Sequence, residues 1–310
     1  MALIKPPRLK PGSTVGIVAP ASNIRPDWLE AGIRELERLG LRVKYLPSIF
    51  EKHFYLAGSD ERRADELMDM IADPNVTAIF AARGGYGSAR VFDRLDEEVI
   101  RRHPKIVMGY SDITALLLWL QTRFGWVVFH GPMVTREFAA GPGHYDEELF
   151  WRVLGRAEPI GEIDTSGTKI LSPGQARGRL VGGCLTLFTS ALGTNYECDT
   201  TDAILFLEDY QARPYQVDRM LTHLRQANKL LRVQGLIFGE MTECIQHEAQ
   251  GYTIEDVIRE CVGDLGVPIL FGLRSGHSDW GNLVLPLGVE ATLDCTSGRP
   301  RLIIEESAVE

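Results

Sequence analysis

The sequence lacks long apolar runs. Its longest ones, such as residues 113–120, fall well short of the roughly 20 residues that a helix needs to span a bilayer. The N-terminal stretch MALIKPPRLKPG contains neither the apolar core nor the cleavage site of a signal peptide. We therefore expect no membrane association and a cytoplasmic location.

The sequence also lacks an excess of positive charge. The chain has 33 Lys and Arg against 42 Asp and Glu, which gives a formal net charge of −9. Nonspecific binding to nucleic acid or to anionic lipid needs a cationic surface, so we expect neither as a partner. An anionic substrate would instead need a local basic pocket.

Cysteines are few, and metal-binding motifs are missing from the sequence. The five cysteines are odd in number, widely separated and without a CxxC pair, which favours reduced core residues. No HExxH motif occurs, and the only short pair of Cys and His, Cys244 with His247, has no further nearby ligand except Glu248. We expect neither a metal site nor a cofactor.

The length and the pattern of the chain indicate two α/β domains. Its 310 residues suffice for about two domains, and 45% apolar with 24% charged residues is ordinary for a compact protein. Between residues 12 and 133, short β-branched runs alternate with amphipathic stretches, which is typical of a parallel sheet covered by helices. A Gly-, Pro- and Ser-rich stretch follows, and after residue 178 a second alternation ends in strands alone.

The expected fold is therefore a Rossmann-like parallel-sheet domain followed by a C-terminal mixed α/β domain with several strands. We place the first domain at residues 1–160, a linker at 161–176 and the second domain at 177–310. Right-handed crossovers would connect the parallel strands.

Two polar motifs follow strands of the predicted N-terminal sheet, which is where ligands bind in open α/β sheets. The motif RGGYG, residues 83–87, can expose backbone N–H groups, so a phosphate loop, an oxyanion loop and a plain tight turn all fit it. The motif MGYSDITALL places Ser111 at a sharp turn between a strand and a helix, as in a nucleophile elbow, although Ile113 replaces its second glycine. A serine there is commonly a helix N-cap, but the neighbouring glycine loop would supply the oxyanion donors that a nucleophile requires.

Two further polar motifs lie in the C-terminal half. The sequence FLEDY ends an apolar strand with Glu208 and Asp209, which alone could be solvated turn residues. Among the seven histidines, His277 in SGHSDWGN lies in a dense run of small and polar residues after a strand. His130, at the end of VVFHGPM, is the alternative candidate, and a buried hydrogen-bonded imidazole is its other interpretation.

These motifs, taken together and in order, resemble the LD-carboxypeptidase family of serine peptidases. That family includes murein tetrapeptide carboxypeptidases and microcin C self-immunity hydrolases. The resemblance covers about residues 12–290 and rests on GSTVGIVAPAS, ARGGYGSAR, MGYSDITALL with HGPM, GGCLTLFTSALGT, LEDY with PYQVDRML, and SGHSDWGN.

The resemblance implies a Ser-Glu-His triad. Ser111 would be the nucleophile, His277 the general base, and Glu208 the residue that orients the imidazole. Because Ser111 belongs to the first predicted domain and its two partners to the second, the active site would be a cleft between domains.

The same resemblance implies an oxyanion hole, formed by the backbone N–H groups of Asp112 and of Gly85, which follows Gly84 in the glycine loop. A carboxypeptidase must also recognise a free carboxylate, for which the planar arginine side chain is suited. Arg83 and Arg274 lie beside the motifs and are the candidates, with a structural ion pair as the other interpretation of each.

The expected function is that of a serine carboxypeptidase that hydrolyses the L,D-peptide bond to a C-terminal D-amino acid. Its partner would be a small muropeptide, murein tetrapeptide cleaved to tripeptide and D-Ala in peptidoglycan recycling, and the protein would be a homodimer. The alternative is a hydrolase of peptidyl or aminoacyl nucleotide toxins, in which Trp280 would stack on the base.

Two other classes of protein fit less well. A nucleotide-binding or redox Rossmann protein needs a ribose-binding acid about 20 residues after its glycines. Asp93 and Asp96 fall instead within or just after a helical pattern. A catalytically inactive binding module would have no need for all three triad residue types.

Overall fold

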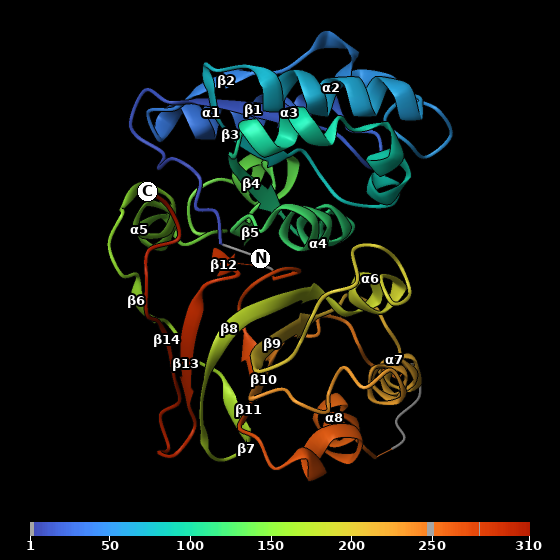
Figure 1. The fold of residues 1–310 in the computed structure, drawn as a ribbon, viewed down its shortest axis with the longest axis vertical. Helices are drawn as coiled ribbons and strands as arrows, with labels where there is room; N and C mark the ends of the chain where they lie inside the picture. Colours follow the sequence, from blue (N-terminus) through green and yellow to red (C-terminus); the bar gives the residue numbers. More distant parts are fainter. Residues whose placement is uncertain (1–2, 247–250, 279) are drawn as a thin grey trace.

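The computed structural model describes residues 3–246, 251–278 and 280–310, and these residues form two β-sheets with helices packed around them. Figure 1 shows the first sheet and its helices in the upper half and the second sheet in the lower half. The predicted α/β class is confirmed, with two sheets in the described chain.

The first sheet has six strands in the order β12-β5-β4-β3-β1-β2. Strands β1 to β5 pair in parallel, as the alternation predicts, and β12 is antiparallel to β5 at one edge. The strands are β1 (Thr14–Val18), β2 (Arg42–Lys44), β3 (Val76–Ala81), β4 (Ile106–Gly109), β5 (Val128–His130) and β12 (Leu285–Leu287). The helical segments of this half are α1 (Pro26–Arg38), η1 (Pro47–Phe50), α2 (Asp60–Ala72), η2 (Ser88–Arg94), α3 (Glu97–Arg102), α4 (Ile113–Phe124), η3 (Val134–Phe138) and α5 (Glu147–Gly155).

The second sheet has eight strands in the order β6-β14-β13-β8-β9-β10-β11-β7. Its central strands β8 to β11 are parallel, and the outer strands pair antiparallel. The strands are β6 (Gly161–Ile163), β7 (Lys169–Ser172), β8 (Gln175–Cys184), β9 (Ala203–Glu208), β10 (Gly235–Gly239), β11 (Ile269–Leu273), β13 (Glu290–Asp294) and β14 (Arg301–Ile304). The helical segments are α6 (Leu185–Ser190), α7 (Pro214–Gln226), α8 (Ile254–Val262) and η4 (Gly263–Leu265).

No helix in the described parts of the chain combines the length and the apolar character that a membrane crossing requires. The longest, α1, α2 and α7, have 13 residues each.

Two features of the connectivity bear on the predicted domain boundaries, which stay a prediction. The segment 161–176, expected as a linker, contains β6 and β7, and both strands belong to the second sheet. Strand β12 comes from the C-terminal part of the chain but completes the first sheet, where Leu285 pairs with His130. The chain therefore passes from one sheet to the other more than once.

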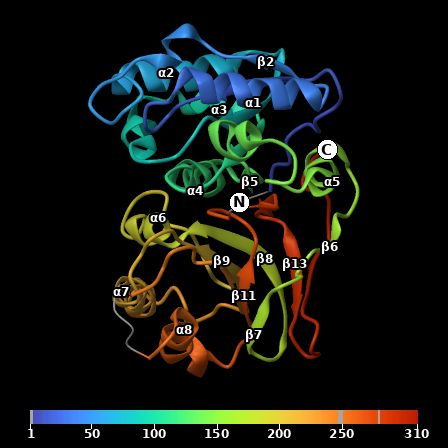
Figure 2. The ribbon, with the colours of Figure 1, turned by 180° about the vertical axis from the view of Figure 1, so that it is seen from behind.

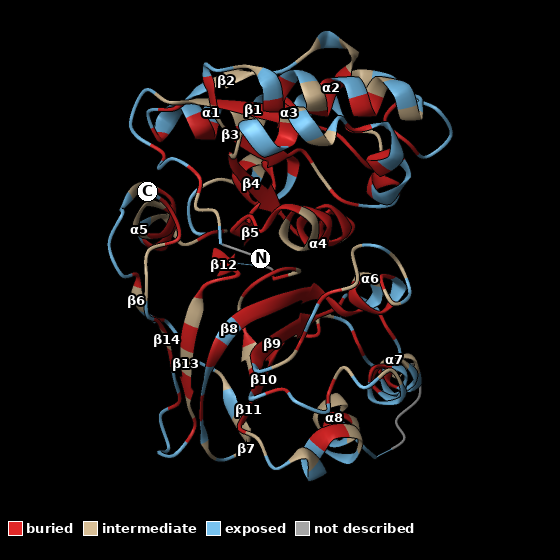
Figure 3. Cartoon of the chain, in the orientation of Figure 1, coloured by how far each residue is buried: buried red, intermediate tan, exposed pale blue. Residues whose placement is uncertain are grey.

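Helix α4 lies where the two halves meet, as both ribbon views show (Figures 1 and 2). Its sequence, ITALLLWLQTRF, is apolar around most of its circumference, which is typical of a helix buried on all sides. Figure 3 shows it largely buried. Leu117 packs in the core of the first half, whereas Leu118 packs in that of the second. The helix that begins beside Ser111 is thus held by both halves.

Candidate active site

Ser111 occupies the sharp turn between β4 and α4. Its φ of +61° lies in the left-handed region, which is uncommon for a residue other than glycine and is frequent at functional sites. The helix N-cap is Asp112 rather than Ser111, and the Asp112 carboxylate accepts from the backbone N–H of Ser88 at 2.8 Å. The turn therefore leaves the serine hydroxyl free of a capping role.

The glycine loop at residues 83–87 packs directly against this turn. A Cβ atom placed on Gly84 would lie 2.8 Å from Ser111 Cβ and 3.0 Å from Ser111 Oγ, so only glycine allows this approach. The loop is anchored on its other side because Ser22 Oγ accepts from the Tyr86 N–H at 3.2 Å. The two strand-end motifs of the N-terminal half thus meet, as the rule for open sheets predicts.

Glu208 and His277 form a buried pair. The side chain of Glu208, the last residue of β9, is 2% exposed, and that of His277 is 14% exposed. Glu208 Oε2 accepts from the His277 ring at Nδ1 over 2.7 Å and from the His277 backbone N–H over 3.2 Å. A Cβ on Gly276 would lie 2.5 Å from Glu208 Cδ, so the glycine before the histidine permits this contact. The pairing leaves the second ring nitrogen, Nε2, for another partner.

Each member of this pair also shifts the pKa of the other. Burial raises the pKa of Glu208, but the charge of His277 and the polar contacts with His130 and His277 outweigh burial and lower that pKa to about 2. Burial lowers the pKa of His277, but the charge and the hydrogen bond of Glu208 outweigh it, so the pKa is raised above its ordinary value. Glu208 is therefore an anion at neutral pH and supports a positive charge on His277.

Two tyrosines enclose the His277 ring. Tyr210 stacks on it with centroids 5.1 Å apart and an interplanar angle of 11°. Tyr110 meets it edge-on with centroids 4.9 Å apart. Because Tyr110 directly precedes Ser111, this contact brings His277 of the second half to the β4–α4 turn of the first.

His277 contacts Tyr110, the residue before Ser111, but no hydrogen bond joins the side chains of His277 and Ser111 in the described chain. Such contacts are often loose without substrate and tighten when substrate binds. All three residues of the predicted triad therefore lie at the boundary between the halves, with the Glu208–His277 contact formed.

His130, the alternative histidine, lies behind Glu208. It is fully buried at the end of β5, its Nδ1 is 3.0 Å from Ser275 Oγ, and its Nε2 is 3.6 Å from Glu208 Oε1. It is thus an imidazole of the interior, near the opposite oxygen of the carboxylate that holds His277.

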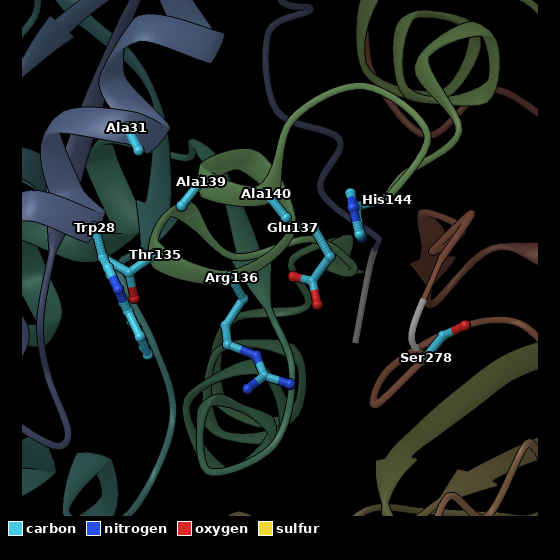
Figure 4. A pocket seen from close by; sticks show the side chains of 9 residues that line it. All are labelled: Trp28, Ala31, Thr135, Arg136, Glu137, Ala139, Ala140, His144 and Ser278. Carbon is cyan, nitrogen blue, oxygen red and sulfur yellow. The ribbon is translucent and has the colours of Figure 1, made fainter.

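A cavity of about 340 Å³ is bordered by Ser278, the residue after His277. Figure 4 shows Arg136 extending into it from the segment after β5, with Ser278 on the opposite side. The lining residues are Trp28, Ala31, Thr135, Arg136, Glu137, Ala139, Ala140, His144 and Ser278. The cavity therefore extends to the residue that follows His277 and is lined by the positively charged side chain of Arg136.

The three arginines near the site differ in their partners. Arg274 Nη2 forms an ion pair with Asp164 Oδ2 at 2.6 Å, which is the structural interpretation of this residue. Arg83 donates to the Asn23 carbonyl at 3.3 Å, and burial together with the charge of Arg136 lowers its pKa. Within the described residues, neither Arg83 nor Arg136 forms an ion pair with a carboxylate.

Of the remaining candidates, Asp209 has a structural role, and the others lie outside the described residues. Asp209 is buried and accepts from the Thr186 N–H at 2.8 Å and its hydroxyl at 2.7 Å, so it caps the start of α6. His247 and Glu248 lie outside the described residues, as does Asp279 of SGHSDWGN. Among the residues that are described, no three Asp, Glu, His or Cys side chains group as metal ligands.

Several residues of the site were not singled out from the sequence. Tyr110 directly precedes Ser111 and Tyr210 lies two residues after Glu208, and an aromatic residue at such a position in the motif was the available signal. Arg136 follows HGPM at the end of β5, so the strand-end rule could have identified it. Ser22, in the loop after β1, carried no comparable signal.

Comparison with known proteins identifies the family. The LD-carboxypeptidase N-terminal domain matches residues 15–131, and the LD-carboxypeptidase C-terminal domain matches residues 177–293. The chain belongs to the LD-carboxypeptidase family. The resemblance inferred from the motifs is thus confirmed.

Two relatives of this LD-carboxypeptidase family member have names that state different activities. The chain is 37% identical over 292 residues to the probable murein peptide carboxypeptidase of Bacillus subtilis, covering 94% of this chain and 91% of that protein. It is 27% identical over 316 residues to the microcin C7 self-immunity protein MccF of Escherichia coli, covering 91% of each.

Solved structures of a muramoyltetrapeptide carboxypeptidase and of MccF share the fold. The muramoyltetrapeptide carboxypeptidase of Oxalobacter formigenes superposes with a TM-score of 0.84 at 27% identity, covering 95% of this chain and 99% of that one. MccF in complex with glutamyl sulfamoyl guanosine superposes with a TM-score of 0.89 at 24% identity, covering 99% of each chain. The second comparison concerns the fold alone.

Proposed function

We propose that this peptidase is a serine carboxypeptidase that cleaves the bond before a C-terminal D-amino acid, with Ser111, His277 and Glu208 as its triad. The observation that carries the proposal is the position of the His277 ring. One ring nitrogen is held by Glu208 at 2.7 Å, and the ring packs against Tyr110, which adjoins Ser111. This arrangement supports a base, oriented by a carboxylate, beside a serine at a nucleophile elbow.

In this mechanism Ser111 Oγ attacks the scissile carbonyl carbon while His277 Nε2 takes the hydroxyl proton. The tetrahedral intermediate collapses when the C–N bond breaks and His277 returns the proton to the leaving amine. Water then attacks the acyl-enzyme, again with His277 as base, and the shortened peptide leaves with a new carboxylate. Glu208 holds the ring through Nδ1 and stabilises the imidazolium that forms in each half-reaction.

The oxyanion would be bound by the backbone N–H groups of Asp112 and Gly85. Neither group donates a hydrogen bond to any acceptor in the described chain, so both are free for a ligand. A Cβ atom placed on Gly84 would lie 3.2 Å from the Asp112 backbone nitrogen. The glycine loop and the Asp112 N–H are thus close together beside Ser111, which supports one oxyanion site formed by both. The N-terminus of α4 adds its positive dipole end there.

Arg83 and Arg136 would bind the free carboxylate of the substrate. They are close enough for the charge of one to lower the pKa of the other, and neither is neutralised by an ion pair among the described residues. Two such cations attract an anion, whereas Arg274 already has Asp164. The cavity beside Arg136 adjoins Ser278, so the bound carboxylate would lie near His277.

Murein tetrapeptide is the proposed substrate, with D-Ala as the leaving group. The sequence identity to a probable murein peptide carboxypeptidase is 37%, against 27% to the self-immunity protein. Hydrolysis of an aminoacyl nucleotide is the second candidate, favoured by Trp280, whose side chain is 70% exposed and available to stack on a base. A cytoplasmic location and a homodimer stay predictions.

Product analysis tests the proposal. The protein is incubated with murein tetrapeptide and, separately, with an aminoacyl sulfamoyl adenosine, and the products are identified by mass spectrometry. We expect tripeptide and D-Ala from the first incubation; hydrolysis of the second substrate alone would replace the proposal with its alternative.

The Ser111→Ala variant, which keeps the fold, should lower turnover by about six orders of magnitude. Glu208→Gln should cost less, on the order of 10⁴-fold, because its role is orientation and charge stabilisation. A Ser111→Ala variant with a tenth of the wild-type activity would refute the triad.

A further inference from the structure

Two buried polar atoms face each other behind the proposed triad, and neither has a hydrogen-bond partner in the described chain. They are His130 Nε2 and Glu208 Oε1, which lie 3.6 Å apart. The two side chains are 0% and 2% exposed. A buried carboxylate oxygen without a donor is costly, so a donor is expected at this place, and the imidazole nitrogen is the nearest atom that can supply a proton.

The contacts of Ser275 limit the ways in which His130 can carry its proton. Ser275 Oγ lies 3.0 Å from His130 Nδ1 and 3.0 Å from the Leu283 carbonyl, and its one hydrogen can serve only one of them. If the hydrogen goes to Nδ1, the proton of a neutral ring is on Nε2. If it goes to Leu283, Nδ1 must donate to Ser275, and Nε2 of a neutral ring then faces the carboxylate with a lone pair. Glu208 Oε1, which is buried without a donor among the described residues, favours the first arrangement, because that one places an N–H against it.

We infer that His130 is a positioning residue whose Nε2–H faces Glu208 Oε1 and fixes the rotation of the carboxylate. This inference rests on the proposed triad. Glu208 Oε2 already accepts two hydrogen bonds from His277. With the His130 N–H facing Oε1, each oxygen of the carboxylate faces a donor. Rotation of the carboxylate would then be restricted while His277 gains and loses its proton.

The place of His130 in the fold extends this role. It ends β5 of the first sheet, pairs there with Gly109 of β4, and lies opposite Glu208 of the second sheet. The strand that leads to Ser111 is thereby connected to the strand that carries the acid of the triad. His130 would hold the two halves of the site in register without touching substrate.

The other groups around the carboxylate do not replace this donor. Tyr110 and Phe206 contact the His130 ring with their rings, at centroid distances of 6.0 and 5.1 Å. Cys184, at the end of β8, and Asp209 also feel the charge of Glu208, and burial raises the pKa of both. The charge of Glu208 therefore disfavours a negative charge on either of these two neighbours.

Nitrogen-15 spectra of histidine-labelled wild-type protein test the proton position without any assay of activity. The spectrum distinguishes a protonated from an unprotonated ring nitrogen, and His130→Asn supplies the assignment. We expect a proton on Nε2 of His130 at neutral pH and a changed Nε2 signal in Glu208→Gln. An unprotonated Nε2 in the wild type would overturn the inference, even if the proposed reaction is correct.

Activity of paired variants tests the role. His130→Asn can keep a contact to Ser275 but does not reach Glu208, whereas the longer amide of His130→Gln can donate to Oε1. We expect His130→Asn to lower kcat by about tenfold to a hundredfold and His130→Gln to lower it less. His103→Asn, at the end of α3, is the matched control and should leave kcat unchanged.

The double variant separates positioning from a general structural effect. If His130 acts through Glu208, then adding His130→Asn to Glu208→Gln should lower the residual kcat by less than about twofold. An equal loss in both backgrounds would show a structural role and refute the inference. Absence of hydrolysis by the wild type would instead refute the proposed function and leave the nitrogen-15 result to decide.

Discussion

At the scale of single residues, the pKa of His277 is set by its burial and by three charged neighbours. Burial lowers its pKa, Glu208 and then Asp209 raise it, and Arg136 lowers it, with a net pKa above the ordinary value. The base must be neutral to accept the Ser111 proton. The active form is therefore lost as the pH falls through a value above about 6.5.

The first prediction follows from this direction. The acid limb of kcat/KM should have an apparent pKa above about 6.5 in the wild type. In Glu208→Gln it should move to lower pH, because the main cause that raises the pKa of His277 is gone. Profiles of kcat/KM against pH for both proteins measure it; an unchanged or higher limb in the variant would contradict the pairing.

A second residue-scale prediction concerns Arg136. Arg136→Met should lower kcat/KM for murein tetrapeptide by about tenfold to a hundredfold, because one charge-assisted hydrogen bond to the terminal carboxylate is lost. With the C-terminally amidated tetrapeptide, the same change should cost less than about threefold. Steady-state kinetics with both peptides measure this discrimination.

Arg42→Met, on the exposed edge strand β2, is the control for loss of a cation elsewhere. Equal losses with acid and amide in Arg136→Met would show that Arg136 binds another part of the substrate.

At the scale of elements, the site depends on how α4 sits between the sheets. Thr114, in the first turn of α4, accepts a hydrogen bond from the Cys184 N–H at the end of β8 over 3.1 Å, and Thr114 is fully buried. The helix that begins beside Ser111 is thereby attached to the second sheet, next to the strand that carries Glu208.

The third prediction concerns this attachment. Thr114→Val keeps the shape of the side chain but leaves the buried N–H of Cys184 without an acceptor, so we expect a loss of about 1–3 kcal/mol in the free energy of unfolding. Thr114→Ser keeps the hydroxyl and should lose less, about 1 kcal/mol for the missing methyl group. Denaturant midpoints of the three proteins measure the difference, and a valine variant as stable as the wild type would argue against the attachment.

The elements of the site were largely predictable because local patterns determine them. The alternation of apolar runs and amphipathic stretches predicted strands β1 to β5, and polar residues at strand ends predicted Ser111 and the glycine loop. The place of β12 was not predictable, because its pairing with β5 joins residues far apart in the chain. Arg136 was overlooked because its segment has no strong periodic pattern, and only the three-dimensional packing brings it near His277.

At the scale of the whole molecule, the two halves share a large part of their interior. The larger core cluster contains Val15 and Phe80 of the first sheet together with Phe206 and Leu270 of the second. The first sheet also depends on β12, which the chain reaches only after completing β11 of the second. The core of the first half therefore continues into the second sheet, whereas the second half has a further core cluster of its own, to which Leu118 of α4 contributes.

The fourth prediction is a single cooperative unfolding transition. Tryptophan fluorescence, dominated in its buried part by Trp119 and Trp126 of the first half, should change at the same denaturant concentration as the far-UV circular dichroism of the whole chain. The calorimetric and van't Hoff enthalpies should agree. Two separated transitions would show that the halves unfold independently despite the shared core.

The position of β12 also limits how such proteins can recombine. A chimera of two relatives joined at one point between residues 161 and 176 would inherit β5 from one parent and its edge partner β12 from the other. His130 pairs with Leu285 at that seam, so mismatched parents would disturb the strand end behind Glu208. A functional exchange of the N-terminal half therefore requires residues 285–287 to be transferred with it, as a second, separate segment of the same inherited unit.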